Sequence, residues 1–145
     1  RSAGAKVHDG ATYLAMEGPQ FSTRAESLMY RQWGADVIGM TGMPEAKLAR
    51  EAELCYASVA MVTDYDCWRE GHDAVDVQQV IATLVANAGR AKALVTALPG
   101  LMAPVRAPCP QGCDHALSHA VMTAPDQRDA DLLAKLDAVA GRVLR

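Results

Sequence analysis

Asp64 and Asp66 are the pair of residues whose type and spacing best fit acid–base chemistry. They lie two positions apart, immediately after the apolar run from Cys55 to Thr63. In an extended backbone such residues point to the same side, and neighbouring carboxylates repel, which raises the pKa of one of them. A carboxyl of this kind can donate a proton or bind the amino and ring-nitrogen groups of a base. A solvated loop with acidic turn residues is the alternative, because Asp is common after strands.

Two further loops contain residues able to bind a ligand. Thr41 and Gly42 follow an apolar run, where a hydroxyl and backbone N–H groups can hold an oxyanion. An ordinary turn capped by Thr41 is the simpler interpretation. Phe21, the only Phe in the chain, follows Gly18-Pro19 and can either stack on a ligand ring or fill the core.

A possible metal-binding pattern occurs near the C-terminus. Cys109, Cys113, His115 and His119 are all residue types that bind zinc. Only Asp114 separates the cysteine pair from the histidine pair, whereas zinc fingers place a loop of about a dozen residues there. We therefore expect a connector followed by a helix, no metal site, and no assigned role for these four side chains.

The order of apolar runs predicts an α/β fold. Strands are expected at residues 6–8, 12–17, 36–40 and 55–63. Helices are expected at residues 23–33, 44–53 and from Asp76 onward. Asp9-Gly10 is a turn signal between the first two strands, and Thr23 with Glu26 fits a capping box. Ligands collect at the carboxyl ends of such strands, so the loops 17–21, 40–41 and 63–66 are predicted to line one crevice.

Composition excludes several classes of protein. The 145 residues have a formal charge of −3 and are half hydrophobic, which argues against nucleic-acid binding and against disorder. No unbroken apolar run approaches the roughly 20 residues of a membrane span. Four cysteines without a signal sequence are typical of a reducing, cytoplasmic setting.

Prolines and glycines crowd residues 99–112, so we divide the chain into an α/β part at 1–98 and a connector with C-terminal helices at 99–145, both of one domain.

Three long motifs resemble those of the S-methyl-5'-thioadenosine phosphorylases, a family of trimeric purine nucleoside phosphorylases. They are the stretch from Glu17 to Ser27 (EGPQFSTRAES), the stretch from Trp33 to Thr41 (WGADVIGMT) and the stretch from Cys55 to Trp68 (CYASVAMVTDYDCW). The resemblance runs from about Lys6 to Leu98. It implies a mixed sheet flanked by helices, and cleavage of methylthioadenosine by phosphate into adenine and 5-methylthioribose 1-phosphate. No metal or organic cofactor is implied, and phosphate is a co-substrate.

The resemblance also assigns roles to individual residues. Asp64 is expected to hydrogen-bond or protonate the purine N7, Asp66 to hold the exocyclic amino group, and Thr41 to bind phosphate. Ser22 and Val77 match positions tied to substrate choice. The other residues expected at the substrate are Phe21, Ile38, Met40, Tyr65, Val75 and Val80.

The sequence differs from the family pattern at two residues, and it is shorter than the family members. Gly39 replaces an Asn and Gly42 a second Thr, which leaves the preference for 6-amino bases open. Family members are about twice as long, and the glycine-rich phosphate loop of their N-terminal half has no counterpart here. We therefore expect a C-terminal half that is inactive alone, from a trimeric enzyme of methionine and purine salvage. The alternatives are a methylthioinosine or general purine nucleoside phosphorylase, or a non-catalytic assembly module.

Overall fold

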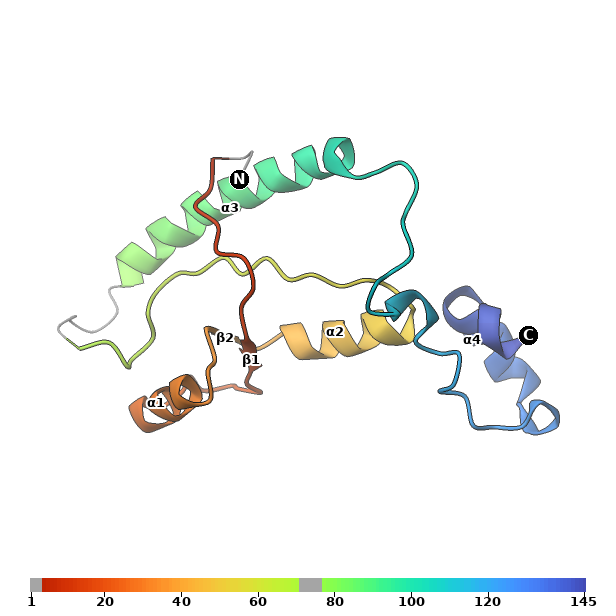
Figure 1. Ribbon diagram of the computed structural model, residues 1–145. Coiled ribbons are helices and arrows are strands. Elements are labelled where there is room, and N and C mark those ends of the chain that lie inside the picture. Colours follow the sequence, from red (N-terminus) through yellow and green to blue (C-terminus); the bar gives the residue numbers. More distant parts are fainter. Residues whose placement is uncertain (1–3, 71–76) are drawn as a thin grey trace. The chain divides into compact units, whose positions relative to one another are not determined.

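The computed structural model describes residues 4–70 and 77–145 (Figure 1). These residues belong to two compact units, one of residues 1–40 and 59–104 and one of residues 41–58 and 105–145. The elements in chain order are β1 (Tyr13–Ala15), α1 (Arg24–Gln32), β2 (Val37–Gly39), α2 (Gly42–Glu51), α3 (Val77–Leu101), the 3-10 turns η1 (Cys113–His115) and η2 (Pro125–Gln127), and α4 (Ala130–Leu144).

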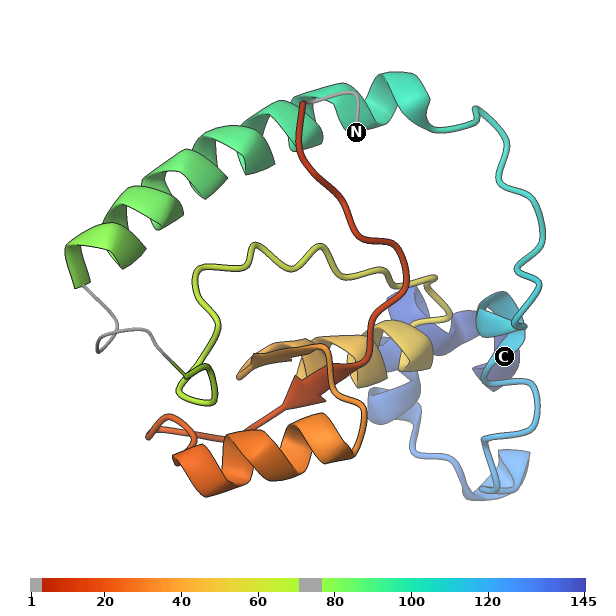
Figure 2. The ribbon, with the colours of Figure 1, turned by 60° about the vertical axis from the view of Figure 1, so that its left-hand side comes forward.

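A parallel β–α–β unit forms the centre of the first unit. β1 pairs with β2 in parallel, with Leu14 opposite Ile38, and α1 connects them. Figure 2 shows the two strands side by side with α1 next to them. The expected strand at 36–40 is therefore confirmed as β2. A parallel pair joined by a helix is the unit from which α/β sheets are built.

The predicted hairpin about Asp9-Gly10 is wrong. Gly10 does adopt a positive φ of 70°, but residues 6–8 form no strand, and β1 pairs with β2 instead. Val7 is the only large apolar residue in that first run, so pairing it would bury little surface. The apolar run around Ile38 offers β1 a better partner.

α1 begins and ends as its sequence predicts. The Thr23 hydroxyl accepts a hydrogen bond from the Glu26 N–H at 3.3 Å, and the Glu26 carboxylate accepts one from the Thr23 N–H at 2.7 Å. This reciprocal capping box satisfies two of the N–H groups that a helix start leaves unpaired. Gly34, with φ of 83°, takes the left-handed conformation that favours glycine just past the helix end.

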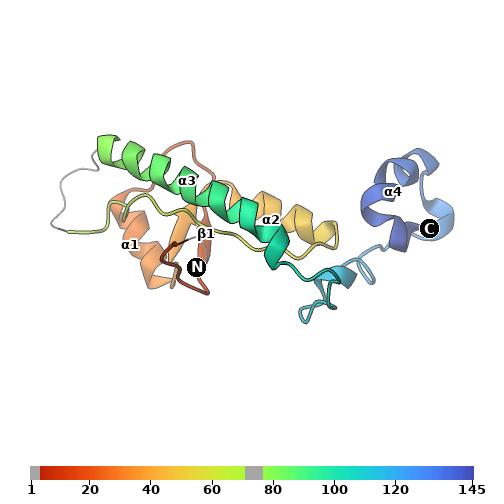
Figure 3. The same cartoon turned by 90° about the horizontal axis from the view of Figure 1, so that it is seen from above.

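The expected strand at 55–63 is not formed. Residues 54–66 have no regular structure, and Figure 3 shows the stretch 59–66 as coil next to α3. Its anchor is Asn87 of α3, whose amide donates to the Val62 carbonyl at 3.0 Å. A strand exists only where neighbouring strands accept its hydrogen bonds, and in the described part of the chain none lies beside this run.

The second and third helices also differ in detail from their predictions. α2 begins at Gly42, two residues before Pro44, which places the proline within the first turn, where a missing N–H costs little. α3 continues through Pro99, so the connector starts at Met102 rather than at residue 99. Asp76, the expected cap of α3, lies outside the described residues.

α3 is an apolar helix with an exposed surface. By length and composition alone it is long and apolar enough to cross a membrane, a test that core helices of soluble proteins also pass. Its large apolar side chains include Ile81, Leu84 and Val95, which are 53%, 49% and 65% exposed. Among the described residues no hydrophobic side chain is fully buried, and the buried polar ones are Ser27 and Asn87.

Ion pairs and hydrogen bonds hold the second unit together. The Arg142 guanidinium of α4 binds the Glu53 carboxylate with two N–H donors, one of them Nε at 2.7 Å. Glu53 also accepts from the Leu117 N–H at 3.0 Å, and its side chain is only 11% exposed. These donors lower the pKa of Glu53 to about 2, Arg142 having the largest effect. Glu53 therefore ties the chain just after α2 to both C-terminal segments.

Candidate functional site

The two carboxylates predicted as a pair are adjacent but point to different partners. Asp64 accepts from the Thr63 hydroxyl at 2.7 Å and from the Asp66 N–H at 2.8 Å. Asp66 has a φ of 59°, in the left-handed region, so the backbone turns here. The expectation of extended geometry with both side chains on one side is therefore wrong. The Asp66 N–H that turns toward Asp64 offsets part of the repulsion between the two charges.

A serine from α1 holds the Asp66 carboxylate. The Ser27 hydroxyl donates to one carboxylate oxygen at 2.5 Å, and the Cys67 N–H donates to the other at 2.8 Å. Ser27 is 2% exposed, so this bond is shielded from water. The sequence placed Ser27 in a family motif without a role. The structure identifies it as the residue that orients Asp66.

Aromatic and cationic side chains surround the acidic turn. The Tyr65 and Trp68 rings meet edge to face, with centroids 6.2 Å apart. The Arg69 guanidinium lies 4.1 Å from the Tyr65 ring centroid, and that of Arg31, from α1, lies 3.6 Å from the Trp68 ring centroid. Such cation–π contacts fix flat side chains near a site without using their hydrogen-bonding groups.

The loop after β1 contacts both other predicted loops of the first unit. Gly18 has φ of 71°, which favours glycine, and a Cβ there would come within 2.9 Å of the Met40 sulfur, so the two loops lie close together. On the other side the Cys67 thiol donates to the Ser22 carbonyl at 3.4 Å. The loops that follow β1, β2 and the stretch 59–63 are thus in contact. The sequence predicted that these loops lie close together, because ligands collect at the carboxyl ends of strands.

The remaining predicted residues are placed as follows. Phe21 is 83% exposed and Val77, the first residue of α3, is 68% exposed, while Ile38 and Val80 are half-buried. Thr41 belongs to the second unit, where its side chain makes no capping bond to α2. Val75 lies outside the described residues. The structure therefore brings together Ser22, Met40, Asp64, Tyr65 and Asp66 through their loops, and it leaves the roles of all these residues as predictions.

A parallel β–α–β unit is typical of α/β proteins, a class in which ligands collect at the carboxyl ends of the strands. Comparison with known proteins makes the class specific. The chain belongs to the phosphorylase superfamily, whose profile matches residues 1–98.

Individual relatives narrow the family further. S-methyl-5'-thioadenosine phosphorylases of Cereibacter sphaeroides and Bradyrhizobium diazoefficiens are 66% and 61% identical to it over 145 and 142 residues. These alignments cover 100% and 98% of this chain but 50% and 49% of the relatives. The chain thus spans about half the length of the curated relatives it matches.

Solved structures agree with this placement. A methylthioadenosine phosphorylase from an Antarctic soil metagenomic library superposes with a TM-score of 0.69 at 42% identity, covering 89% of this chain and 44% of that one. The methylthioadenosine phosphorylase of Schistosoma mansoni in complex with adenine gives a TM-score of 0.58 at 32% identity, covering 74% and 37%. The predicted phosphorylase fold is confirmed, here with a two-stranded parallel part of the sheet.

Proposed function

We propose that this chain supplies the purine side of an S-methyl-5'-thioadenosine phosphorylase, which cleaves that nucleoside with phosphate into adenine and 5-methylthioribose 1-phosphate. The observation that carries the proposal is the carboxylate turn at Asp64–Asp66, with Asp66 held by the buried Ser27. The turn occurs in a chain 66% identical to a protein of that name.

The carboxylate turn suits a leaving purine. Phosphate oxygen attacks the anomeric carbon, the bond to the purine N9 breaks, and the electron pair moves into the ring. A proton donor or hydrogen bond at N7 stabilises that charge, and Asp64, exposed at the turn, is the group we assign there. Asp66 accepts one protein hydrogen bond on each oxygen and keeps a further lone pair on each for a 6-amino group.

The phosphate side is represented by Thr41 alone. Its hydroxyl makes no capping bond to α2 and so is not used by the helix. One hydroxyl is too little to hold a dianion against water, because transferring phosphoryl or anionic groups needs several donors. We therefore propose that the isolated chain does not catalyse the reaction and that the rest of the phosphate site comes from the half of the enzyme that this chain does not span.

Further properties belong to the same proposal. The complete enzyme needs no metal or organic cofactor for the reaction, works in the cytoplasm in methionine and purine salvage, and forms a trimer. Phe21, Ile38, Met40 and Tyr65 contact the nucleoside, with Val75 and Val80 beside its methylthio group. Ser22 and Val77 tune the choice of substrate.

The test fuses this chain to the part of a relative that the chain does not span. The part of the Cereibacter sphaeroides relative that the alignment leaves uncovered is fused upstream of Arg1, and phosphate-dependent base release is measured from methylthioadenosine and from methylthioinosine. We expect activity from the fusion and none from the chain alone, with methylthioadenosine preferred. Preference for methylthioinosine would instead support the 6-oxo alternative, and a folded but inactive fusion would support the assembly module.

Asp64→Asn sharpens the test. An amide offers an N–H to a 6-oxo base and no proton to N7, so we expect kcat/KM for methylthioadenosine to fall by about 100-fold, in line with the loss of one general acid. The ratio of methylthioinosine to methylthioadenosine turnover is expected to rise. Asp9→Asn, at an exposed position outside the loops, is the matched control. An unchanged selectivity in Asp64→Asn would contradict the assigned role.

A further inference from the structure

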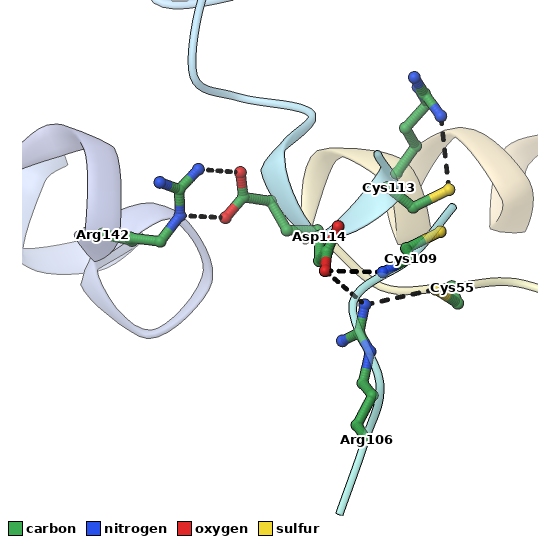
Figure 4. Close-up of polar contacts among 8 residues, drawn as sticks. Cys55, Arg106, Cys109, Cys113, Asp114 and Arg142 are labelled. Atoms are coloured by element: carbon green, nitrogen blue, oxygen red, sulfur yellow. Dashed lines mark hydrogen bonds and ion pairs between the residues drawn. The ribbon is translucent and has the colours of Figure 1, made fainter. Parts of the chain in front are cut away.

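Three cysteine sulfurs converge in the second unit. The Sγ atoms of Cys55, Cys109 and Cys113 all lie within 4.8 Å of one another. Figure 4 shows them at one place, with Arg106 and Asp114 beside them. Neither His115 nor His119 belongs to the group, although the sequence pattern had suggested those histidines as companions of the cysteine pair.

A tight turn brings Cys109 and Cys113 together. The Gly112 N–H donates to the Cys109 carbonyl at 3.0 Å, and Gly112 has φ of 66°, which favours glycine. The Asp114 carboxylate accepts from the Cys109 N–H at 3.0 Å and closes the turn from the other end. Cysteines on a glycine-containing turn of this kind are typical of zinc sites, in which both sulfurs bind the same ion.

Cys55 comes from a distant segment that is independently fixed. Glu53, two residues before it, has a φ of 55° and binds both Arg142 and the Leu117 N–H. These contacts place the chain after α2 against the segment that contains the cysteine turn. The convergence of the sulfurs therefore does not depend on any bond between them.

Guanidinium groups lie around the sulfurs. Arg106 donates to the Cys55 sulfur at 3.3 Å, and Arg50 of α2 donates to the Cys113 sulfur at 3.6 Å. Three thiolates around a divalent cation carry a net negative charge, and outer N–H donors to the ligating atoms stabilise such a complex.

We propose that Cys55, Cys109 and Cys113 form a structural site for a thiophilic divalent cation, Zn²⁺, that fastens the segment after α2 to the C-terminal segment. Each cysteine gives up its thiol proton and binds through the thiolate. A tetrahedral zinc with Zn–S distances of about 2.3 Å separates its sulfurs by about 3.8 Å, which the cluster reaches with small movements. A water molecule fills the fourth position.

The proposal differs from a disulfide in a measurable way. A disulfide joins two sulfurs at about 2.05 Å, needs an oxidant and leaves the third cysteine unused. A zinc site uses all three and forms under reducing conditions. It is also independent of the phosphorylase reaction, since no group in it is assigned to substrate.

The test uses the full 145-residue chain, purified with a non-thiol reductant and stripped of metal. Zn²⁺ is titrated in competition with a chromogenic chelator, and Co²⁺ serves as a spectroscopic probe. We expect one ion per chain, a sulfur-to-cobalt charge-transfer band, and protection of three cysteines from alkylation. Cys55→Ser, Cys109→Ser and Cys113→Ser are each expected to weaken binding by more than about tenfold, the lower limit for losing even an outer contact.

Cys67→Ser is the matched control, because Cys67 lies outside the cluster, and its binding is expected to equal that of the wild type. X-ray absorption on the zinc-loaded wild-type chain counts the sulfurs directly and does not depend on any variant folding. Three sulfur ligands support the proposal. Zinc bound through nitrogen and oxygen only, no binding, or a disulfide between two of the three cysteines in the reduced preparation overturns it.

Discussion

Ser27 is the residue whose importance is clearest from geometry. It is nearly fully buried, and its hydroxyl donates to Asp66 from the first turn of α1. We expect Ser27→Ala to let the Asp66 carboxylate rotate away from its bound orientation. A lost hydrogen bond to a charged group costs about 1.5–3 kcal/mol, which corresponds to roughly 10- to 100-fold in kcat/KM for methylthioadenosine in the fused enzyme.

A double-mutant cycle distinguishes orientation of Asp66 from general destabilisation. If Ser27 acts through Asp66, Ser27→Ala adds little loss in an Asp66→Asn background. Ser58→Ala, at an exposed position, is the control and is expected to leave kcat/KM unchanged. Additive losses in the double mutant would contradict the orienting role.

At the scale of the element, α1 has a pH-sensitive start. Hydrogen bonds from the N–H and hydroxyl of Thr23 hold the pKa of Glu26 below its usual 4.5. A carboxyl whose pKa is lower in the folded than in the unfolded state contributes its full stabilisation when the pH is above the unfolded-state pKa. This contribution is lost as the pH falls through the folded-state pKa. We therefore expect the N-terminus of α1 to loosen below pH 4.5, as measured by exchange of its first amide protons in the fused enzyme.

Two variants check the cause. Glu26→Gln keeps a hydrogen-bonding side chain without a charge, so the loss of protection below pH 4.5 is expected to disappear. Thr23→Ala removes the hydroxyl donor but keeps the backbone N–H, which has the larger effect, so the pKa of Glu26 is expected to rise only part of the way toward 4.5, as followed by its side-chain NMR shift. A Glu26 pKa that does not change at all in Thr23→Ala would contradict a contribution from the hydroxyl and leave the shift to the Thr23 N–H.

Elements with local signals were predictable from sequence, and elements that depend on distant partners were not. α1 follows from Thr23 and Glu26 alone, and β2 from its apolar run, because both signals act over a few residues. The run 55–63 carries an equally strong strand pattern yet stays coil, since strand hydrogen bonds need neighbours that local sequence cannot supply. The same reason explains why Asp9-Gly10 turns the chain without making a hairpin.

The site was predictable in part for the same reason. Strand-end reasoning placed the loops of Gly18, Met40 and Asp66 together, and contacts between those loops exist. It missed Ser27 and the φ of Asp66, because a single left-handed residue changes which way a carboxylate points. It also separated Cys55 from Cys109 and Cys113, since contacts between distant residues, such as that of Glu53 with the Leu117 N–H, bring those segments together.

At the scale of the whole molecule, the apolar surface is the feature that needs a partner. Phe21, Val105 and Met122 are 83%, 80% and 90% exposed, and no hydrophobic side chain of the described residues is fully buried. Exposed apolar area of this extent is typical of a surface that another segment covers. Burying apolar surface stabilises a fold by about 25 cal/mol per Å² and is the main favourable term in folding. Because this chain alone buries little apolar surface, it gains little of that stabilisation.

We therefore expect the isolated chain to bind an apolar dye strongly, to unfold without a sharp transition, and to exchange the amide protons of α3 rapidly. In the fusion with the uncovered half of the Cereibacter sphaeroides relative, dye binding is expected to fall and α3 to become protected, because the added half covers the apolar face of α3. Protection of α3 that is already high in the isolated chain would show that this half buries its own core, and the expected inactivity would then rest on the missing phosphate ligands alone.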